Sequence, residues 1–432
     1  MKVVHIITGL GVGGAETSLA RLAPRLARRG VVQQVVSLLP PGPLAAPLEA
    51  AGVPVASLHL RRGAPSPAAL WRLVRLLRRE NPDVVQTWLY HADLLGLVAA
   101  GLARRGQVVW NIRCADMDLS RYARTTAWTV AACARLSGRP AAVVTNSGRA
   151  AWYHTHKLGY HPRRVEVIPN GFDGEVFRPE SPPTSPPSHS SEHSPEHLPQ
   201  QSSDLPQNQF INPSLESSLK QAPEGHVEHA QDGGLAPGAR RRREAWGIGP
   251  EAFVIGMAAR FDPMKGHDVL AQALGRLGPE SGVVCVLCGE GMEASNAELV
   301  ALLDSAGASA MVRLVGRQED MPGFYTALDV AVTASHTESF PNAVGEAMAC
   351  GVPCVVTDVG DAAEIVAETG LVVAPGAPED LARAIRAMRD MPRQDRQRRG
   401  AVARERVLLC YGVDVMTEKY MRLYQSLVAP EG

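Results

Sequence analysis

The amino-acid sequence predicts an α/β protein built from two doubly wound domains, and two observations support this fold class. Short β-rich runs alternate with helical patterns along residues 1–178, and the same alternation resumes at about residue 240 and continues to residue 432. Strands that alternate with helices form βαβ units, in which helices cover both faces of a parallel sheet. A chain of 432 residues is long enough for each domain to bury its own core.

The β-rich runs give the positions of the strands. In the first domain they predict strands at 2–8, 32–38, 53–58, 83–87, 107–111, 141–145 and 165–168. Helical patterns lie between most of these runs, for example at 14–29, 67–79, 90–104 and 120–137. In the second domain we expect strands near 253–259, 283–288, 311–315, 329–334, 352–357 and 371–374. The chain is expected to end in helices, from about residue 378 to residue 428.

The segment 179–239 separates the two domains by its composition. It contains 11 Pro and 11 Ser among 61 residues, with few aromatic or branched apolar side chains. Because such a segment cannot bury enough apolar surface to offset its chain entropy, we predict a disordered linker insertion. His189, His193 and His197 recur every fourth residue, which would suit a metal site on a helix, but the surrounding prolines disfavour that helix.

Composition bounds the class of protein. No run of 18 or more apolar residues is present to span a membrane, and the N-terminus lacks the pattern of a secretory signal, so we expect a cytoplasmic protein. The seven scattered cysteines argue against a disulfide framework. Cys285 and Cys288 form a CxxC inside a strand-like run, where residues three apart face opposite sides and cannot share a metal.

The net charge of zero hides an asymmetry along the chain. Residues 1–150 hold 19 Lys and Arg against 7 Asp and Glu, a balance of +12, and the remaining residues carry −12. This split indicates that the N-terminal half faces something anionic. Nothing in the sequence indicates a nucleic-acid partner.

A glycine-rich loop follows the first predicted strand. Gly9, Gly11 and Gly14 satisfy the dinucleotide pattern GxGxxG, but the second strand ends without the acidic residue that a dinucleotide ribose requires. A loop at a helix N-terminus remains, in which the backbone amides around Gly13 and Gly14 can approach an anion closely.

Two cations follow the strand expected at 253–259. Arg260 and Lys265 lie five residues apart across a strand-to-helix turn, at the carboxyl end of a parallel strand, where α/β folds bind ligands. An arginine fork and a lysine charge can converge on a diphosphate from two directions. We therefore interpret them as diphosphate-binding residues rather than as solvated surface charges.

The most specific signal is the segment from Glu338 to Pro353. Pro341 is well placed to begin a helix, which leaves Glu338 on a loop and Glu346 in the second helical turn. Carboxylates accept hydrogen bonds from vicinal hydroxyls, and a helix N-terminus favours phosphates. We predict a donor site that also includes the residues between the two glutamates, namely Ser339, Phe340, Pro341 and Asn342.

With these motifs the sequence resembles the retaining glycosyltransferase family 4, the glycosyl transferases group 1, whose architecture of two Rossmann-like domains facing a cleft is called GT-B. Glu338 and Glu346 match its hallmark E-x7-E motif, and Arg260 and Lys265 match as well. Other matching segments are 13–16, 168–173 and 289–291. The resemblance covers nearly the whole chain except 179–239.

The resemblance implies a function and a role for each matching residue. It implies a 1–178 acceptor domain, a 240–432 donor domain and a final helix at about 413–428 that packs on the first domain. The donor would be a UDP- or GDP-linked sugar, transferred with retention to a glycan or lipid-linked acceptor in polysaccharide or glycolipid synthesis, without a metal or other cofactor. Glu338 would contact the sugar hydroxyls and Glu346 the ribose.

One departure from the family concerns the catalytic residues. Many relatives place a His just after the fifth strand of the first domain, where this sequence has Arg113 and Cys114. His91, after the fourth strand, is another candidate for the cleft, although a lone His is more often structural. The predicted catalytic residues are therefore Glu338, Arg260, Lys265 and His91. Asp116 and Asp118 form a DxD, which we interpret as coincidence because it lies in the acceptor domain.

Part of the excess positive charge of the first domain is concentrated in one segment. The stretch 69–79 predicts a helix with an apolar face, an arginine-rich face and an aromatic edge at Trp71. It is either an ordinary surface helix or a helix that docks on anionic lipid headgroups. We therefore expect an anionic membrane surface as a partner only under the second interpretation.

Two other functions remain open. Some sugar-nucleotide epimerases share the GT-B architecture, but they lack the E-x7-E segment. A non-catalytic relative would retain the nucleotide pocket and lose transfer, and the missing His favours this reading, whereas the intact Arg260, Lys265, Glu338 and Glu346 oppose it.

Overall fold

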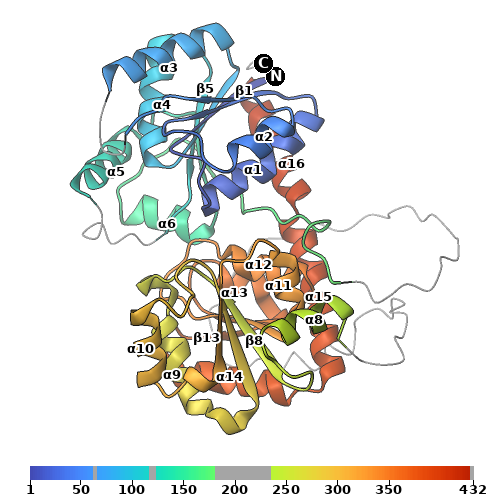
Figure 1. Ribbon diagram of the computed structural model, residues 1–432. Coiled ribbons are helices and arrows are strands. Elements are labelled where there is room, and N and C mark those ends of the chain that lie inside the picture. Colours follow the sequence, from blue (N-terminus) through green and yellow to red (C-terminus); the bar gives the residue numbers. More distant parts are fainter. Residues whose placement is uncertain (62–65, 116–122, 181–234, 429–432) are drawn as a thin grey trace, which may run out of the picture.

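The computed structural model describes residues 1–61, 66–115, 123–180 and 235–428, which form two α/β domains (Figure 1). Each domain is a parallel sheet with helices on both faces, so the predicted fold class is confirmed. Most of the predicted linker 179–239, with its three histidines, lies outside the described residues, and so does the DxD of Asp116 and Asp118. The last three residues of that predicted linker, 237–239, belong to a helix, Pro237–Ala245.

The N-terminal sheet has the order β3-β2-β1-β4-β5-β6-β7, with every pair of neighbours parallel. The strand order therefore reverses between β1 and β4, and such a reversal opens a crevice at the carboxyl ends of the strands. The strands are β1 (Lys2–Ile7), β2 (Val32–Ser37), β3 (Val55–Ser57), β4 (Val84–Trp88), β5 (Gln107–Ile112), β6 (Ala142–Thr145) and β7 (Val165–Val167). The helices are α1 (Gly14–Arg28), α2 (Ala45–Ala50), α3 (Pro67–Glu80), α4 (Tyr90–Ala103), α5 (Arg124–Leu136) and α6 (Gly148–His156).

The C-terminal sheet has the order β10-β9-β8-β11-β12-β13 and is also parallel, with its reversal between β8 and β11. Its strands are β8 (Phe253–Ala258), β9 (Val283–Cys288), β10 (Val312–Gly316), β11 (Val330–Thr333), β12 (Cys354–Thr357) and β13 (Leu371–Val373). The α-helices around it are α8 (Pro237–Ala245), α9 (His267–Leu277), α10 (Ala297–Ser305), α11 (Met321–Thr326), α12 (Asn342–Ala349), α13 (Ala362–Val366) and α14 (Pro378–Asp390). Short 3-10 turns join them: η2 (Pro263–Lys265), η3 (Pro279–Ser281), η4 (Ser309–Met311) and η5 (Ala367–Thr369).

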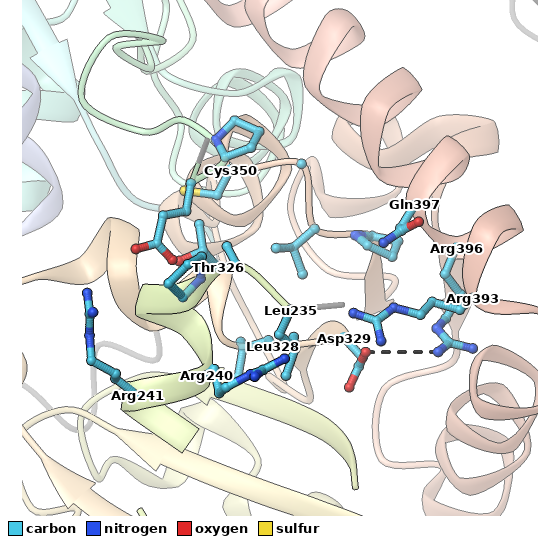
Figure 2. A pocket seen from close by; sticks show the side chains of 17 residues that line it. Leu235, Arg240, Arg241, Thr326, Leu328, Asp329, Cys350, Arg393, Arg396 and Gln397 are labelled. Atoms are coloured by element: carbon cyan, nitrogen blue, oxygen red, sulfur yellow. Dashed lines mark ion pairs between the residues drawn. The ribbon is translucent and has the colours of Figure 1, made fainter. Parts of the chain in front are cut away.

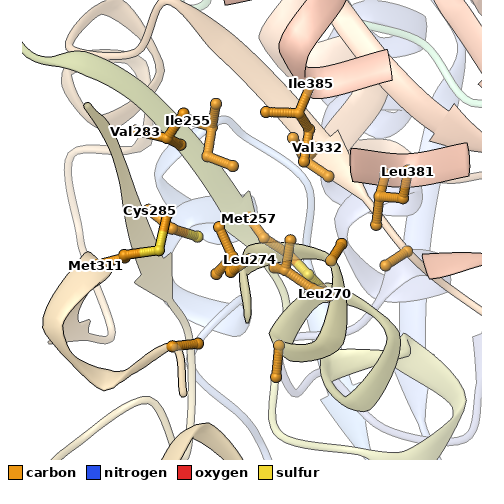
Figure 3. Close-up of a cluster of buried hydrophobic side chains, with 14 of the residues drawn as sticks. Ile255, Met257, Leu270, Leu274, Val283, Cys285, Met311, Val332, Leu381 and Ile385 are labelled. Atoms are coloured by element: carbon orange, nitrogen blue, oxygen red, sulfur yellow. The ribbon is translucent and has the colours of Figure 1, made fainter. Parts of the chain in front are cut away.

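One face of the C-terminal sheet packs on α9 and α14 (Figure 3). Ile255 of β8, Leu274 of α9 and Ile385 of α14 are all completely buried there, and burying one such side chain stabilises a fold by roughly 1.5–3 kcal/mol. Cys285 belongs to this cluster, whereas Cys288 belongs to the cluster on the opposite face. The two cysteines therefore face opposite sides of the sheet, as the sequence predicted.

Two chain segments cross between the domains side by side. The backbone of Phe172 bonds to Tyr411 and Val413, with N–O distances of 2.9 Å in both directions. A Cβ on Gly171 would lie 2.6 Å from the Val413 Cα, so the close approach requires glycine there. Residues 170–173, which follow β7 and are called the connecting segment below, are therefore hydrogen-bonded to the C-terminal part of the chain at Tyr411 and Val413.

The last two helices belong to different domains. The helix α15 (Arg393–Tyr411) packs on α12, and α16 (Val413–Val428) packs on α1 and β4 (Figure 1). Tyr420 and Tyr424 of α16 are fully buried in the core of the N-terminal domain. No helix among the described residues is long and apolar enough to cross a bilayer.

Candidate functional site

The two domains meet at loops that follow strands beside the reversal of strand order in each sheet. The glycine loop follows β1, and the segment that begins at Ser335 follows β11. A Cβ on Gly14 would lie 3.5 Å from the Nδ2 of Asn342, the first residue of α12. The sheet edges that bind ligands in such folds are thus opposed, with the segment between Glu338 and Glu346 at their junction.

Glu338 pairs with a lysine of its own domain. The Lys265 Nζ lies 2.5 Å from the Glu338 Oε1, and the Ser335 hydroxyl donates to the same oxygen at 2.9 Å. Gly266 has a φ of +69° and packs so closely on the carbonyl of Ala334 that no side chain fits. This contact brings the turn after β8 to the loop after β11.

Arg260 has a different partner from Lys265. Its guanidinium lies 2.7 Å from the Asp262 carboxylate, and its side chain is 64% exposed. Asp262 also caps the turn η2, since its Oδ1 accepts from the Met264 N–H at 3.0 Å. The predicted cations therefore follow the same strand, and each is paired with a carboxylate of its own domain. Their convergence on a diphosphate stays a prediction.

Glu346 pairs across the domain boundary. It lies in the second turn of α12, where its Oε1 is 2.6 Å from a terminal nitrogen of Arg21 on α1. The Tyr325 hydroxyl donates to the other oxygen, Oε2, at 3.2 Å. Both members of the ion pair are only 14% exposed.

The residues between the glutamates divide into two groups. The Ser339 hydroxyl donates to the Asn146 Oδ1 at 2.6 Å and lies 3.1 Å from the Ser147 hydroxyl, and the Asn342 Oδ1 accepts from Asn170 at 2.7 Å. These side chains bond to the N-terminal domain and its connecting segment.

Phe340 packs in the core, and Pro341 lies at the start of a helix. The Phe340 ring is buried against Phe172, with a centroid distance of 6.0 Å. Pro341 directly precedes α12, which begins at Asn342, one residue later than the sequence suggested. Donor contacts by these two residues stay a prediction.

Gly13 and Gly14 open α1. Gly13 is extended and precedes the helix, and a Cβ on it would lie 2.5 Å from a carboxylate oxygen of Glu16. Burial raises the pKa of Glu16, which lies in the first turn. The glycine loop therefore lies at a helix N-terminus, and its contact with an anion stays a prediction.

Comparisons with known proteins agree with this arrangement. Residues 12–176 match the family described as Glycosyltransferase Family 4, and residues 239–406 match Glycosyl transferases group 1. The chain belongs to the family 4 glycosyltransferases. The two matched segments flank the predicted linker insertion and contain Gly13, Gly14 and both glutamates.

Curated relatives are D-inositol 3-phosphate glycosyltransferases of actinobacteria. The enzyme of Catenulispora acidiphila is 36% identical over 170 residues, which is 36% of this chain and 40% of that protein, and the enzyme of Thermomonospora curvata is 31% identical over 207 residues, or 45% and 47%. The chain thus matches less than half the length of these relatives.

Solved structures share the fold over the whole chain. HepE of Anabaena in complex with UDP-glucose has a TM-score of 0.73 and 21% identity, covering 99% of this chain and all of HepE. WaaG, a glycosyltransferase involved in lipopolysaccharide biosynthesis, has a TM-score of 0.63 and 15% identity, with both chains covered completely. These likenesses confirm the predicted GT-B fold.

No hydrogen bond or ion pair among the described residues joins His91 to Glu338 or Glu346. His91 is exposed in the first turn of α4, and within the part of the chain that the structure describes it makes no hydrogen bond or ion pair. Desolvation of the ring lowers the pKa of His91. Its catalytic role stays a prediction.

Arg113 directly follows β5, in the segment where the sequence contains no histidine. Its nitrogens donate to Asn111 at 2.7 Å, to Asn170, and to the Tyr420 hydroxyl at 2.7 Å. The guanidinium also covers the Trp88 ring at 4.9 Å, and burial lowers the pKa of Arg113. Since Asn170 bonds to Asn342, Arg113 joins the N-terminal sheet, α16 and the start of α12.

Sequence reasoning missed the residues that meet the motif from the opposite domain. Arg21 is one. Asp361 of the C-terminal domain was missed as well, and its carboxylate accepts from the Gly148 N–H at 3.1 Å, at the start of α6 in the N-terminal domain. A signal for Arg21 exists in the sequence: Arg21, Arg25 and Arg29 recur every fourth residue beside the apolar stripe of α1.

A separate pocket lies beside α8 and α15 on the C-terminal domain (Figure 2). It measures about 660 Å³, and none of the predicted site residues lines it. Arg240, Arg393 and Arg396 contribute to its walls, and Arg396 is 3.9 Å from Asp329. This basic pocket is distinct from the site between the domains.

Proposed function

We propose that the protein transfers a sugar from a nucleoside-diphosphate sugar to a glycan or lipid-linked acceptor, with retention of configuration. The observation that carries the proposal is the position of the E-x7-E segment, which both domains contact. Lys265 reaches it from the turn after β8, and Gly14 and Arg21 reach it from the N-terminal domain. Family membership supports the reaction class and retention.

The proposed roles follow from charge and hydrogen-bonding capacity. Glu338 accepts from the sugar hydroxyls and Glu346 from the ribose hydroxyls, since carboxylate oxygens are acceptors. As the sugar–phosphate bond breaks, negative charge develops on the diphosphate, and Lys265 and Arg260 stabilise it together with the amide groups at the start of α12. The proposal needs no metal or other cofactor, because these cations supply the compensating charge.

Binding of the diphosphate would rearrange existing ion pairs. Lys265 is paired with Glu338 and Arg260 with Asp262, so each cation already has a partner. Arg260 is the more exposed of the two, and its long side chain can turn from Asp262 toward a phosphate at small cost, because exposed ion pairs are worth only about 0–1 kcal/mol.

The experiment that tests the proposal is a thermal-shift screen with UDP, GDP, ADP and their sugars. A ligand at 100 times its Kd stabilises the native state by about 2.7 kcal/mol, which raises the midpoint by roughly 5–10 °C for a domain of this size. The proposal expects one nucleoside diphosphate and its sugar to do so, and transfer to follow when acceptors, including inositol phosphates and lipid-linked glycans, are added. Epimerisation of the donor without any acceptor would contradict it.

A membrane partner belongs to the same proposal, in which the protein acts in the cytoplasm at the inner face of the cell membrane. The buried side of α3 carries Leu73 and Leu77, while Trp71 is 57% exposed. Arg72 and Arg78 donate to the backbone oxygens of Leu58 and Leu102.

Arg75 is the residue of α3 with which to test membrane binding. It is exposed, and within the described residues it has no hydrogen bond or ion pair. Arg75→Glu should reduce binding to anionic vesicles at low salt, with no change for neutral vesicles, because the attraction is electrostatic. Arg386→Glu, an exposed arginine on α14, is the matched control. Equal binding of both variants and the wild type to anionic vesicles would exclude this surface.

A further inference from the structure

Arg21 is held in a fixed position between the two domains. One terminal nitrogen donates to the Gly171 carbonyl at 3.2 Å and the other lies 2.6 Å from the Glu346 carboxylate. The guanidinium carbon also lies over two aromatic rings, at 5.7 Å from the Phe172 centroid and 5.3 Å from that of Phe177. Rings and carbonyl together leave the side chain little freedom to take another rotamer.

The contacts of Arg21 in turn fix the carboxylate of Glu346. Arg21 binds its Oε1 and the Tyr325 hydroxyl binds its Oε2, so both oxygens have a partner that sets the plane of the group. An ionised carboxylate has about four acceptor positions, and these two bonds leave room for further donors such as ribose hydroxyls. The pair thus orients Glu346 without blocking it.

We propose that Arg21 is a positioning residue for recognition of the donor ribose. It acts through Glu346, and the inference rests on the proposed function, in which that carboxylate accepts from the ribose. Because Arg21 lies on α1 of one domain and Glu346 on α12 of the other, the ribose site is complete only when the domains have this relative position. Ribose recognition is therefore coupled to the arrangement of the domains.

The chain offers a matched control one turn farther along α1. Arg25 also crosses to an acidic partner, with 2.6 Å between its terminal nitrogen and the Asp173 carboxylate, and it is also 14% exposed. Its partner lies in the connecting segment and not in the E-x7-E segment. Loss of Arg25 should therefore perturb the same helix and boundary without affecting the ribose.

The test compares nucleoside diphosphates with and without ribose hydroxyls. UDP, GDP and their 2′,3′-dideoxy forms are titrated calorimetrically into the wild type, Arg21→Met, Arg21→Lys, Arg25→Met and Glu346→Gln. Methionine retains an apolar stem against Phe172 and Phe177 while removing the charge and its N–H groups. The wild type should bind the preferred nucleotide at least about tenfold more tightly than its dideoxy form, since one or two hydrogen bonds to a charged acceptor are lost.

Arg21→Met should bind the ribose nucleotide about tenfold more weakly than the wild type does, and its affinities for the ribose and dideoxy forms should differ by less than about twofold. In Arg25→Met the ratio of these two affinities should be the same as in the wild type. Arg21→Lys should restore part of the discrimination. Tighter binding by Arg21→Met would overturn the inference, because Arg21 would then compete with the ribose. Full discrimination by Arg21→Met, when Glu346→Gln has lost it, would overturn it as well.

The same experiment separates this inference from the proposed function. If Glu346→Gln retains full discrimination, the ribose role of Glu346 fails and the inference fails with it. If Glu346→Gln loses discrimination, the proposed site stands whatever Arg21 does. Should Arg21→Met fail to fold, Arg21→Lys and Arg25→Lys decide: unchanged discrimination in a folded Arg21→Lys overturns the inference.

Discussion

The two glutamates of the E-x7-E segment are held in different ways. Glu338 is paired inside its own domain, with Lys265 at 2.5 Å and Ser335 at 2.9 Å. Glu346, eight residues later, is paired with Arg21 of the other domain at 2.6 Å. One end of the segment is therefore organised by the C-terminal domain alone, while the other depends on how the two domains meet.

This contrast predicts different consequences for mutations at the two ends. A change at the Lys265 end should alter the chemistry and leave the domain contact intact. A change in the residues that cross the boundary should alter stability or binding of the donor, with smaller effects on the rate of transfer.

The largest effect is expected for Lys265→Ala. The substitution removes a cation from the proposed diphosphate site and leaves the Glu338 carboxylate without its partner beside that site. Removing one preorganised electrostatic contact to a developing charge lowers kcat by roughly 10²–10³-fold. The measurement is the initial rate of sugar transfer at saturating donor.

Arg276→Ala is the control for that variant. Arg276 forms an ion pair with Glu379 at 2.5 Å on the surface of the same domain, with 40% of its side chain exposed, so its loss should leave kcat unchanged. If Lys265→Ala transferred sugar at a rate within threefold of the wild type, the Glu338 end would not be the reactive end.

The difference between the two ends of the E-x7-E segment also explains which of its contacts could be predicted from the sequence. The strands and helices are predictable because β-rich runs and the helical period of 3.6 residues are local properties, and Lys265 and Glu338 are predictable because each follows a parallel strand at the edge where ligands bind. The pairing between them follows from β8 and β11 being neighbours in the sheet.

Contacts across the domain boundary could not be predicted in the same way. Arg21 and Glu346 are 325 residues apart in sequence, and no local pattern fixes the relative position of two domains. Phe340 shows the same limit, because its burial depends on Phe172 and Tyr411, which are far from it in sequence and pack against its ring. Arg113 was recognised as a departure, but its bonds to Asn170 and Tyr420 required the connecting segment and α16 to be in place.

A second effect, on stability, is expected at Asp361, which crosses the boundary to the start of α6. Burial raises the pKa of Asp361 from 3.8 to about 6, with Glu364 adding to the shift. The native state therefore holds the proton more tightly than the unfolded chain, so the contribution to stability is complete below pH 4 and is lost as the pH rises through 6. A shift of about two pKa units corresponds to at most about 3 kcal/mol.

Asp361→Asn tests this sign directly. The asparagine cannot ionise and can still accept from the Gly148 N–H, so the variant should be more stable than the wild type above pH 6, with the difference shrinking toward pH 4. The measurement is the thermal midpoint of both proteins from pH 4 to pH 7.5. Glu244→Gln, an exposed residue on α8, should show no such trend. A difference that grows toward low pH would refute the assignment of the shift to Asp361.

The smallest effect is expected for Ser339→Ala, which lies next to Glu338 but bonds across the boundary. The variant loses hydrogen bonds to Asn146 at 2.6 Å and Ser147 at 3.1 Å, and each is worth about 1 kcal/mol. If Ser339 acts only through the domain contact, the KM for the donor should rise by at most about fivefold per lost bond, with kcat unchanged. Ser305→Ala provides the control, because the Ser305 hydroxyl donates to the Leu302 carbonyl within α10. A fall in kcat comparable to that of Lys265→Ala would mean that Ser339 contacts the reacting sugar, and the division between the two ends would then lie after Ser339 and not between Glu338 and Ser339.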